Sequence, residues 1–293
     1  GNDSLSDNVI KTVVDDLKVF PVNTQLSFAL IQPNELNFIG LRRTADTLSS
    51  LNNKDQIFEI GSITKVFTAT LLSHIVQSQN LALDDPIKEY IQIKSDSVAN
   101  ISFKQLANHT SGLPRLPSNL NLNKVNPYNP YKDYDNEKLN SYLTEDFELV
   151  NTPGSSYLYS NLGAGLLGYI LSQITETPYE QLLQNYIFSK YKMQNSTTEI
   201  HKVKENLVDG LNVNGNLTPN WNLNALVAAG GIYSSTNDLS KFVMAQFNKN
   251  DDLLKMTQHK TFEVNKNLAI GLGWHIVKRP NGDKYLWHNG GTG

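Results

Sequence analysis

Ser62 and Lys65 are the residues of this sequence whose types and spacing point most directly to covalent chemistry. They follow Gly61 and begin a run in which apolar residues recur at helical spacing to about Gln79. In the first turn of a helix, free backbone N–H groups and the positive end of the dipole favour a developing oxyanion. A lysine at i+3 lies on the same face as the serine, so the pair suits a nucleophile beside a proton acceptor. The alternative is a helix N-cap serine beside a solvated lysine.

Tyr159 and Asn161 form a second polar pair, placed after the turn signal Pro153-Gly154. They begin a segment rich in glycine and leucine that we expect to be helical. Its small residues leave room for another helix to approach closely: Gly163, Ala164, Gly165 and Gly168. The alternative for Tyr159 is a core tyrosine with a satisfied hydroxyl.

A third element ends the sequence, where His288 opens a glycine-rich run that includes Gly290 and Gly291. It follows the apolar residues Tyr285-Leu286-Trp287. A strand that ends in glycines lets a ligand or another backbone come very close. A nucleotide cradle fits poorly, because the sequence offers no helix after the glycines.

Composition excludes several classes of protein. The 293 residues suffice for a large or two-lobed domain, and 39% hydrophobic residues are typical of a globular chain. The net charge of −3 argues against a nucleic-acid partner, and no apolar run reaches the ~18 residues of a transmembrane segment. Six histidines without metal-ligand spacing predict no metal and no cofactor. The absence of cysteine excludes disulfides and leaves the redox compartment undecided.

Periodicity and turn signals place strands at both ends of the chain, with helices between them. His74, on the apolar stripe of the Ser62 helix, is expected to be a satisfied core residue, with one face of that helix buried. The loop 114–136 offers Tyr128, Tyr131 and Tyr134 as aromatic surface for a substrate, or is a plain surface loop. The expected helices are 6–20, 62–79, one starting at Asp84-Asp85-Pro86, and 235–247, and the expected strands are 25–31, 36–42, 58–60, 268–277 and 284–288.

Ser-x-x-Lys, Tyr-x-Asn and His-x-Gly in this order resemble the serine β-lactamase and penicillin-binding-protein superfamily. The similarity is to the branch of class C β-lactamases, D-alanyl-D-alanine carboxypeptidases and related esterases. It covers about Gln25 to Gly293, and its landmarks include the segments 81–86, 109–114, 228–232 and 271–274. His109, in one of them, is expected to be a hydrogen-bonded structural histidine.

The resemblance implies an α/β fold of the α+β type, with an antiparallel sheet flanked by helices and an inserted all-helical lobe. We expect a single catalytic domain over 1–293. Its sheet lobe would comprise about 1–61 and 230–293, and its helical lobe about 80–229. Family members continue beyond the glycine-rich strand, so we expect further strands and a helix after residue 293.

The resemblance also implies a serine hydrolase that forms an acyl-enzyme at Ser62, with Lys65 and Tyr159 sharing the proton transfers. Asn161 would orient the lysine and hold a polar substrate group. His288, Gly290 and Gly291 would bind substrate, and the N–H groups of Ser62 and Gly291 would form the oxyanion hole. The alternative is a non-catalytic penicillin-binding or peptidoglycan-sensing module on the same fold.

His288 departs from the family pattern, because class C β-lactamases carry lysine at this position. A histidine is charged only in part near neutral pH, so peptidase or esterase activity is favoured over β-lactam turnover. The partner would be a small-molecule or peptide substrate, while its identity and the oligomeric state stay open. Gly1 is typical of a residue left by tag cleavage, so we expect a native targeting segment and export to the periplasm or cell envelope.

Overall fold

The N-terminal part of the chain forms a helix and a three-stranded antiparallel sheet. A computed structural model describes residues 3–94 and 100–293. Helix α1 (Asp3–Leu17) precedes strands β1 (Gln25–Gln32), β2 (Glu35–Arg43) and β3 (Leu48–Ser50). The β1–β2 register runs to the pair Gln32 and Glu35, so the hairpin turns at Pro33-Asn34, as the sequence predicts.

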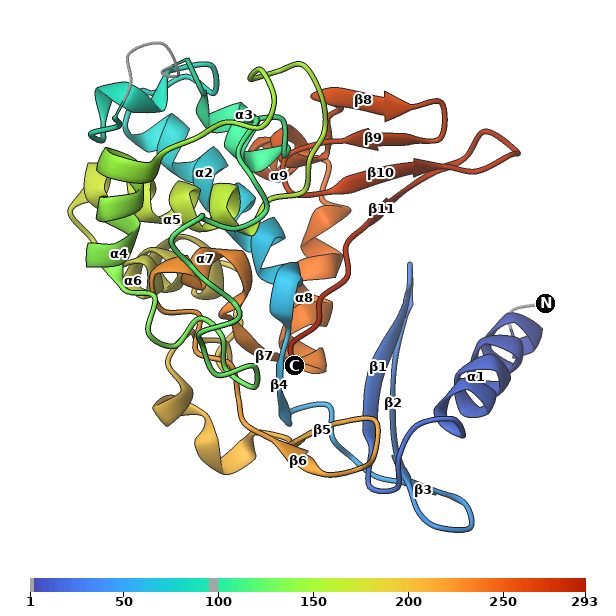
Figure 1. The fold of residues 1–293 in the computed structure, drawn as a ribbon. Helices are drawn as coiled ribbons and strands as arrows, with labels where there is room; N and C mark the ends of the chain where they lie inside the picture. The colour runs from blue at the N-terminus through green and yellow to red at the C-terminus, as the bar shows by residue number, and fades with distance from the viewer. Residues whose placement is uncertain (1–2, 95–99) are drawn as a thin grey trace.

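A second antiparallel sheet, in the order β11-β10-β9-β8, gathers the C-terminal strands (Figure 1). The predicted strand 268–277 is in fact two strands, because the chain breaks at Gly271 and Gly273. A Cβ on Gly271 would lie 2.2 Å from the Thr257 carbonyl oxygen, and Gly273 has a φ of +75°. In the described part of the chain, no strand pair joins this sheet to the N-terminal one. The strands are β8 (Phe262–Asn265), β9 (Leu268–Ile270), β10 (His275–Lys278) and β11 (Lys284–Trp287).

Helix α2 (Thr64–Ser78) runs through the middle of the molecule (Figure 1). It follows a 3-10 turn, Gly61–Ile63. Every side chain from Thr64 to Val76 is buried, so the prediction of a single buried face was too narrow. The reason is that α2 packs against helices from several directions: α3 (Phe103–Ala107), α5 (Asn161–Thr175), α6 (Tyr179–Leu183), α7 (Val227–Gly230) and α9 (Asp252–Gln258).

His74, on α2, is buried as predicted, but the prediction of a satisfied side chain was wrong. Its Nε2 has no hydrogen-bond partner among the described residues. Burial lowers the pKa of His74 to about 4, so the ring is neutral at physiological pH. The neutral form is the one that such an apolar position tolerates.

The helical lobe differs from the prediction in two places. Asp84-Asp85-Pro86 leads only into one 3-10 turn, Ile87–Glu89, and the lobe contains a short hairpin of β5 (Gly210–Leu211) and β6 (Leu217–Thr218). Residues 95–99, inside the predicted lobe, lie outside the described residues. The lobe also holds α4 (Asn136–Ser141) and π-helical turns at Tyr142–Asp146 and Gln184–Phe188.

Small residues let α7 approach α5, as predicted. A Cβ on Gly165 would lie 2.6 Å from Leu226 Cδ2, directly before α7, and one on Gly168 would lie 2.2 Å from Ala228 Cβ, in α7. Larger side chains at these positions would push α7 away. The contact therefore fixes where the backbone of α7 lies relative to α5.

The predicted loop ends where α4 begins, but two of its tyrosines are not surface residues. Tyr131 and Tyr134 are buried, while Tyr128 is exposed. The Tyr134 hydroxyl donates to Asn119 Oδ1 at 2.9 Å, which ties the loop to itself. Both alternatives place the tyrosines on the surface, and this was thus wrong for Tyr131 and Tyr134, whose rings are buried.

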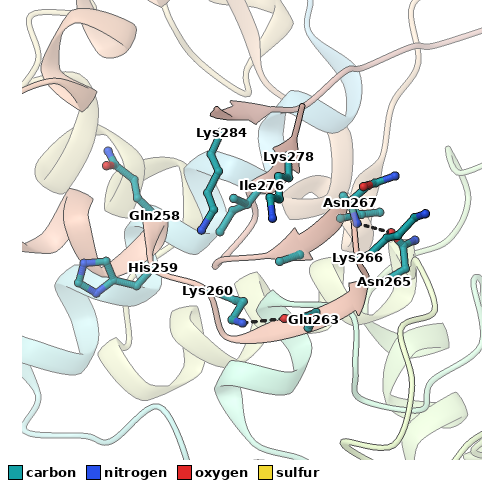
Figure 2. Close-up of a pocket in the computed structure, with 12 residues that line it drawn as sticks. Gln258, His259, Lys260, Glu263, Asn265, Lys266, Asn267, Ile276, Lys278 and Lys284 are labelled. Atoms are coloured by element: carbon teal, nitrogen blue, oxygen red, sulfur yellow. Dashed lines mark hydrogen bonds and ion pairs between the residues drawn. The ribbon is translucent and has the colours of Figure 1, made fainter. Parts of the chain in front are cut away.

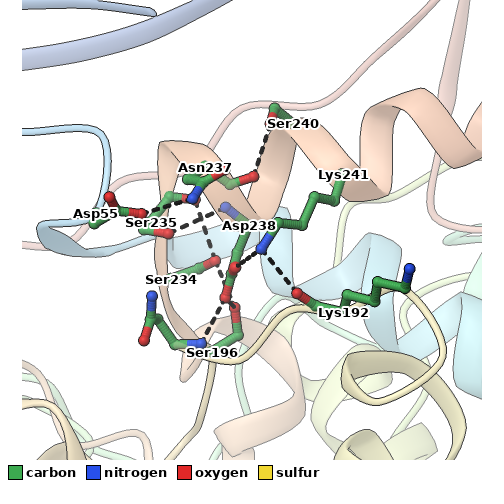
Figure 3. Close-up of polar contacts among 10 residues, drawn as sticks. Asp55, Lys192, Ser196, Ser234, Ser235, Asn237, Asp238, Ser240 and Lys241 are labelled. Atoms are coloured by element: carbon green, nitrogen blue, oxygen red, sulfur yellow. Dashed lines mark hydrogen bonds and ion pairs between the residues drawn. The ribbon is translucent and has the colours of Figure 1, made fainter.

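A buried carboxylate fastens α8 (Thr236–Gln246) to the helical lobe (Figure 3). Asp238 Oδ2 accepts hydrogen bonds from the Asn195 N–H at 2.8 Å and from Ser196 Oγ at 2.9 Å. Asp238 Oδ1 pairs with Lys241 Nζ at 2.9 Å. Ser235 Oγ caps the helix at the Asp238 N–H, as its capping-box spacing predicts. The preceding strand, β7 (Tyr233–Ser235), pairs with β4 (Ile57–Glu59), which leads into the Ser62 turn.

Candidate active site

Ser62 lies in the 3-10 turn between β4 and α2, and Lys65 follows in the first turn of α2. The turn begins at Gly61, whose φ of +52° is in the left-handed region that glycine adopts readily. Lys65 Nζ donates to Ser62 Oγ at 2.9 Å and to the Ala229 carbonyl oxygen at 2.7 Å. The structure therefore brings the two residues into direct contact.

Lys65 is buried, with 3% of its surface exposed. Burial, helped by the nearby charge of Arg115, lowers the pKa of Lys65 to about 7. A substantial fraction of the amines is then neutral at physiological pH. In that form the 2.9 Å contact runs the other way, with Ser62 Oγ donating to the amine lone pair.

Tyr159 lies beside this pair, just before α5. Lys65 Nζ lies 4.8 Å from the centre of the Tyr159 ring. Burial raises the pKa of Tyr159, while a hydrogen-bonding interaction with Ser62 and the charge of Arg115 act in the opposite direction. The hydroxyl thus starts as a neutral group close to Ser62.

Asn161 is the first residue of α5, but the structure does not bring its side chain to Lys65. Its Nδ2 donates to the Tyr131 hydroxyl at 3.5 Å, while the described partners of Lys65 are Ser62 and Ala229. The expected role in orienting the lysine is therefore filled in this structure by the Ala229 carbonyl. Asn161 stays a candidate for holding a polar substrate group.

The glycine run reaches the Ser62 turn from the other end of the chain. A Cβ on Gly290 would lie 2.0 Å from the Ile60 carbonyl oxygen and 2.9 Å from the Ser62 nitrogen. A Cβ on Gly61 would lie 2.6 Å from the Gly291 nitrogen. Only glycines permit this approach, and it places the backbone of Gly290 and Gly291 beside the nucleophile candidate.

His288 lies at the start of that run, with its ring 6.5 Å from the Tyr159 ring. Its Nδ1 is 2.7 Å from the Asn289 carbonyl oxygen, so Nδ1 carries the proton and Nε2 is left as an acceptor. Nε2 is enclosed without a partner among the described residues. Burial lowers the pKa of His288 to about 4, so the ring is neutral at pH 7.

Sequence reasoning missed several neighbours of the site. Tyr157 contacts His275 Nε2 through its hydroxyl at 3.1 Å, and the His275 ring lies 5.1 Å from the His288 ring. The Arg115 guanidinium lies 5.2 Å from the centre of the Tyr159 ring. Their positions offer a signal in the sequence: Tyr157 is two residues from Tyr159, and Arg115 and His275 directly follow the landmarks 109–114 and 271–274.

His109 has the structural role that the sequence predicts. It is buried, and its Nδ1 accepts the Ser160 N–H at 3.1 Å. Its ring lies 4.5 Å from the Tyr159 ring. His109 therefore supports the backbone and the aromatic ring that carry Tyr159.

One hollow of the described chain lies apart from this site. A hollow of about 390 Å³ on the β8–β11 sheet is lined by lysines, among them Lys278 and Lys284 from facing positions of β10 and β11 (Figure 2). None of the predicted site residues lines it. The described residues hold no group of three His, Cys, Asp or Glu side chains placed for a metal ion. No described helix combines the length and hydrophobicity of a membrane span.

Comparison with known proteins gives one consistent family. The family model described as Beta-lactamase matches residues 28–293. A β-lactamase of Pseudomonas fluorescens is 27% identical over 92% of this chain and 75% of its own length. The D-alanyl-D-alanine-carboxypeptidase/endopeptidase AmpH of Escherichia coli K12 is 24% identical over 86% of this chain and 69% of its own.

Solved structures agree with these relatives at the level of the fold. The octameric penicillin-binding protein homologue of Pyrococcus abyssi has a TM-score of 0.80 and 22% identity, over 98% of this chain and 68% of its own. A Pseudomonas syringae beta-lactamase/D-alanine carboxypeptidase has a TM-score of 0.77 and 22% identity, over 94% and 76%. The expected α/β fold and superfamily are thereby confirmed. Because the family model matches most of this chain, the chain belongs to the beta-lactamase family.

Proposed function

We propose that this chain is a serine hydrolase that works through an acyl-enzyme on Ser62. The observation that carries the proposal is the 2.9 Å contact between Ser62 Oγ and a buried lysine amine with a pKa of about 7. An ordinary lysine, with a pKa near 10.4, is almost wholly protonated at neutral pH and is a poor base. Here burial lowers the pKa of Lys65 to about 7, so a substantial fraction of the amine is neutral and can act as a base.

In the proposed reaction the neutral Lys65 amine accepts the Ser62 proton as Oγ attacks the acyl carbonyl carbon. The resulting oxyanion lies by the backbone N–H groups of Ser62 and Gly291, each such donor being worth about 2.7–4 kcal/mol in the transition state. The bond to the leaving group then breaks, and Lys65 or Tyr159 returns the proton to that group. Water hydrolyses the ester and restores Ser62. Because the ionisations of Lys65 and Tyr159 are coupled, the proton transfers are assigned to the two residues together and not to either one alone.

The substrate class in the proposal is D-alanyl peptides or esters, with β-lactams as poor substrates. A neutral His288 gives no permanent cation at the position where class C enzymes have lysine. The backbone of Gly290 and Gly291 would bind the substrate backbone. Export to the periplasm or cell envelope belongs to the same proposal, since D-alanyl peptides are cell-wall components.

Intact-mass measurement tests the proposal. The protein is incubated with a penicillin, a D-alanyl-D-alanine peptide and a short-chain aryl ester, with Ser62→Ala as the control. We expect an adduct or turnover with at least one compound that disappears in Ser62→Ala. Undiminished activity in that variant would overturn the assignment of the nucleophile. A permanent adduct with every compound, and no product release, would instead support the binding or sensing module.

A further inference from the structure

Arg115 is a cation at the site that neither the motifs nor the mechanism uses. Its guanidinium carbon lies 5.2 Å from the centre of the Tyr159 ring, and Lys65 Nζ lies 4.8 Å from the same ring. The Arg115 side chain is exposed, and the Tyr159 side chain is half-buried. A ligand at Tyr159 therefore meets an accessible guanidinium.

The backbone holds Arg115 in a fixed place. Its carbonyl oxygen accepts the N–H groups of Asn161 at 3.0 Å and Leu162 at 3.1 Å, the first two residues of α5. The preceding Pro114 carbonyl accepts Ser160 Oγ at 2.6 Å. The start of α5, which positions Tyr159 and Asn161, is thus the same structure that positions Arg115.

Arg115 has no anionic partner within the described residues. Ion pairs there join lysines to carboxylates elsewhere: to Asp15, Asp84, Glu180, Glu199, Asp238, Asp251, Asp252 and Glu263. The remaining basic groups of the site are neutral or partly neutral at pH 7: Lys65 with a pKa of about 7, His288 with a pKa of about 4, and His109 and His275, whose pKa values burial lowers. Arginine keeps its charge at every physiological pH and binds carboxylates through two parallel hydrogen bonds.

We propose that Arg115 binds a carboxylate of the substrate beside the scissile acyl bond, and that the preferred substrates are therefore anionic acyl compounds. This inference rests on the proposed function and narrows its substrate class. The carboxylate belongs either to the acyl group or to the leaving group, and two pairs of probes separate the two sources. Arg115 is a specificity residue in this proposal and takes no part in the proton transfers.

The first probe pair carries the carboxylate on the leaving group: hippuryl thioglycolate and its methyl ester. The second carries it on the acyl group: 4-nitrophenyl hydrogen adipate and the corresponding methyl ester. For each pair the measured quantity is the ratio of kcat/KM for the acid to kcat/KM for its neutral ester. The variants are Arg115→Gln, Arg115→Lys and, as a matched control, Lys124→Gln, which removes one exposed charge from the same loop.

In one of the two pairs we expect Arg115→Gln to lower the ratio at least tenfold, through KM more than through kcat. Arg115→Lys should restore part of the ratio, and Lys124→Gln should leave it within about twofold, because that lysine is not among the residues at Tyr159. A ratio that Arg115→Gln leaves unchanged in both pairs would overturn the proposal, even if overall activity falls. That pattern would show a structural role only.

Binding to Ser62→Ala separates this proposal from the proposed function. The same four compounds are titrated against Ser62→Ala and against Ser62→Ala with Arg115→Gln, by calorimetry. Tighter binding of one acid than of its methyl ester, lost with Arg115, supports the carboxylate site even if no compound is turned over. Equal binding of acid and ester in both pairs would overturn the carboxylate site, even where Ser62-dependent turnover persists.

Discussion

The Lys65 amine is the group whose ionisation sets the proposed chemistry. Since its pKa is about 7 and the neutral form is the base, acylation of Ser62 should rise with pH through about 7 and level off above it. The check is kcat/KM for a neutral aryl ester between pH 5 and 9. A flat profile, or a midpoint near that of free lysine, would contradict this role.

Arg115 offers a control on the cause of that midpoint. Burial is the larger cause of the lowered pKa of Lys65, and the charge of Arg115 is the second. Arg115→Gln should therefore move the midpoint upward, whereas Lys124→Gln should leave it in place. An unmoved midpoint in Arg115→Gln would show that burial alone sets the pKa.

His288 leads to a prediction about β-lactams. With a pKa of about 4 the ring is neutral at pH 7 and offers no cation to the carboxylate of a cephalosporin. We expect slow hydrolysis of a chromogenic cephalosporin, and faster hydrolysis in His288→Lys. The measurement is the initial rate of hydrolysis followed by absorbance. Wild-type turnover that rivals dedicated β-lactamases would contradict the prediction.

Packing between α5 and α7 should affect the site, because α7 positions a carbonyl that accepts a hydrogen bond from Lys65. Gly168→Ala would force a Cβ to within 2.2 Å of Ala228 Cβ, and the next residue, Ala229, holds Lys65 by its carbonyl. We expect a loss of about 1–3 kcal/mol in the free energy of unfolding, together with lower activity. Gly163→Ala is the matched control, because its Cβ would meet nothing closer than 3.4 Å. Urea unfolding and kcat/KM are the measurements, and equal behaviour of the two variants would refute the coupling.

The carboxylate of Asp238 fastens α8. Asp238→Ala would leave the Asn195 N–H and Ser196 Oγ without their acceptor and Lys241 without its anion. We expect the free energy of unfolding to fall by about 3 kcal/mol, the cost typical of breaking a buried pair. Asp252→Ala removes the carboxylate of an exposed i,i+3 lysine pair on α9 and should cost less than about 0.5 kcal/mol. Similar losses in the two variants, measured by urea unfolding, would contradict the assignment.

For the molecule as a whole, burying Lys65 lowers stability. The lysine has a pKa of 10.5 in the unfolded chain and about 7 in the folded one. Between these pH values the unfolded chain binds more protons, so the stability of the wild type rises with pH. The loss in free energy of unfolding caused by burying Lys65 is largest below pH 7, is about 4 kcal/mol at pH 7, and disappears near pH 10.5.

Lys65→Met should therefore be more stable than the wild type at pH 6–7, and the difference should shrink as the pH rises. The measurement is urea unfolding at several pH values between 6 and 9.5. Lys124→Met, which replaces an exposed lysine, should show no such trend. A stability difference for Lys65→Met that does not change with pH would contradict the buried amine.

The sequence predicted the parts of this fold that local patterns specify. The β1–β2 hairpin, the strand before Ser62 and the cap at Ser235 were all correctly predicted, because each depends on neighbouring residues. The break at Gly271 was not, since it arises from the Thr257 carbonyl in another element. The burial of Tyr134 was missed for the same reason.

The candidate site shows the same division. Ser62 and Lys65 lie on one helix turn, so their spacing predicted their contact. The carbonyl of Ala229, the guanidinium of Arg115 and the ring of His275 come from distant segments that only the folded chain brings near. The expected contact between Asn161 and Lys65 is not among the described hydrogen bonds, in which the Ala229 carbonyl of α7 accepts from the amine.

The fit between Gly61 and Gly291 has a consequence for how the site is made. These glycines touch although they are 230 positions apart in the sequence (291 − 61), so no local folding unit contains both. During synthesis the Ser62 turn leaves the ribosome long before the glycine run exists, and domains fold only as their segments become available. Closing so long a loop is slow compared with forming the helix that carries Lys65. A growing chain would therefore contain the nucleophile and the base before the glycine run that lies against them, and would stay inactive until that run has been made.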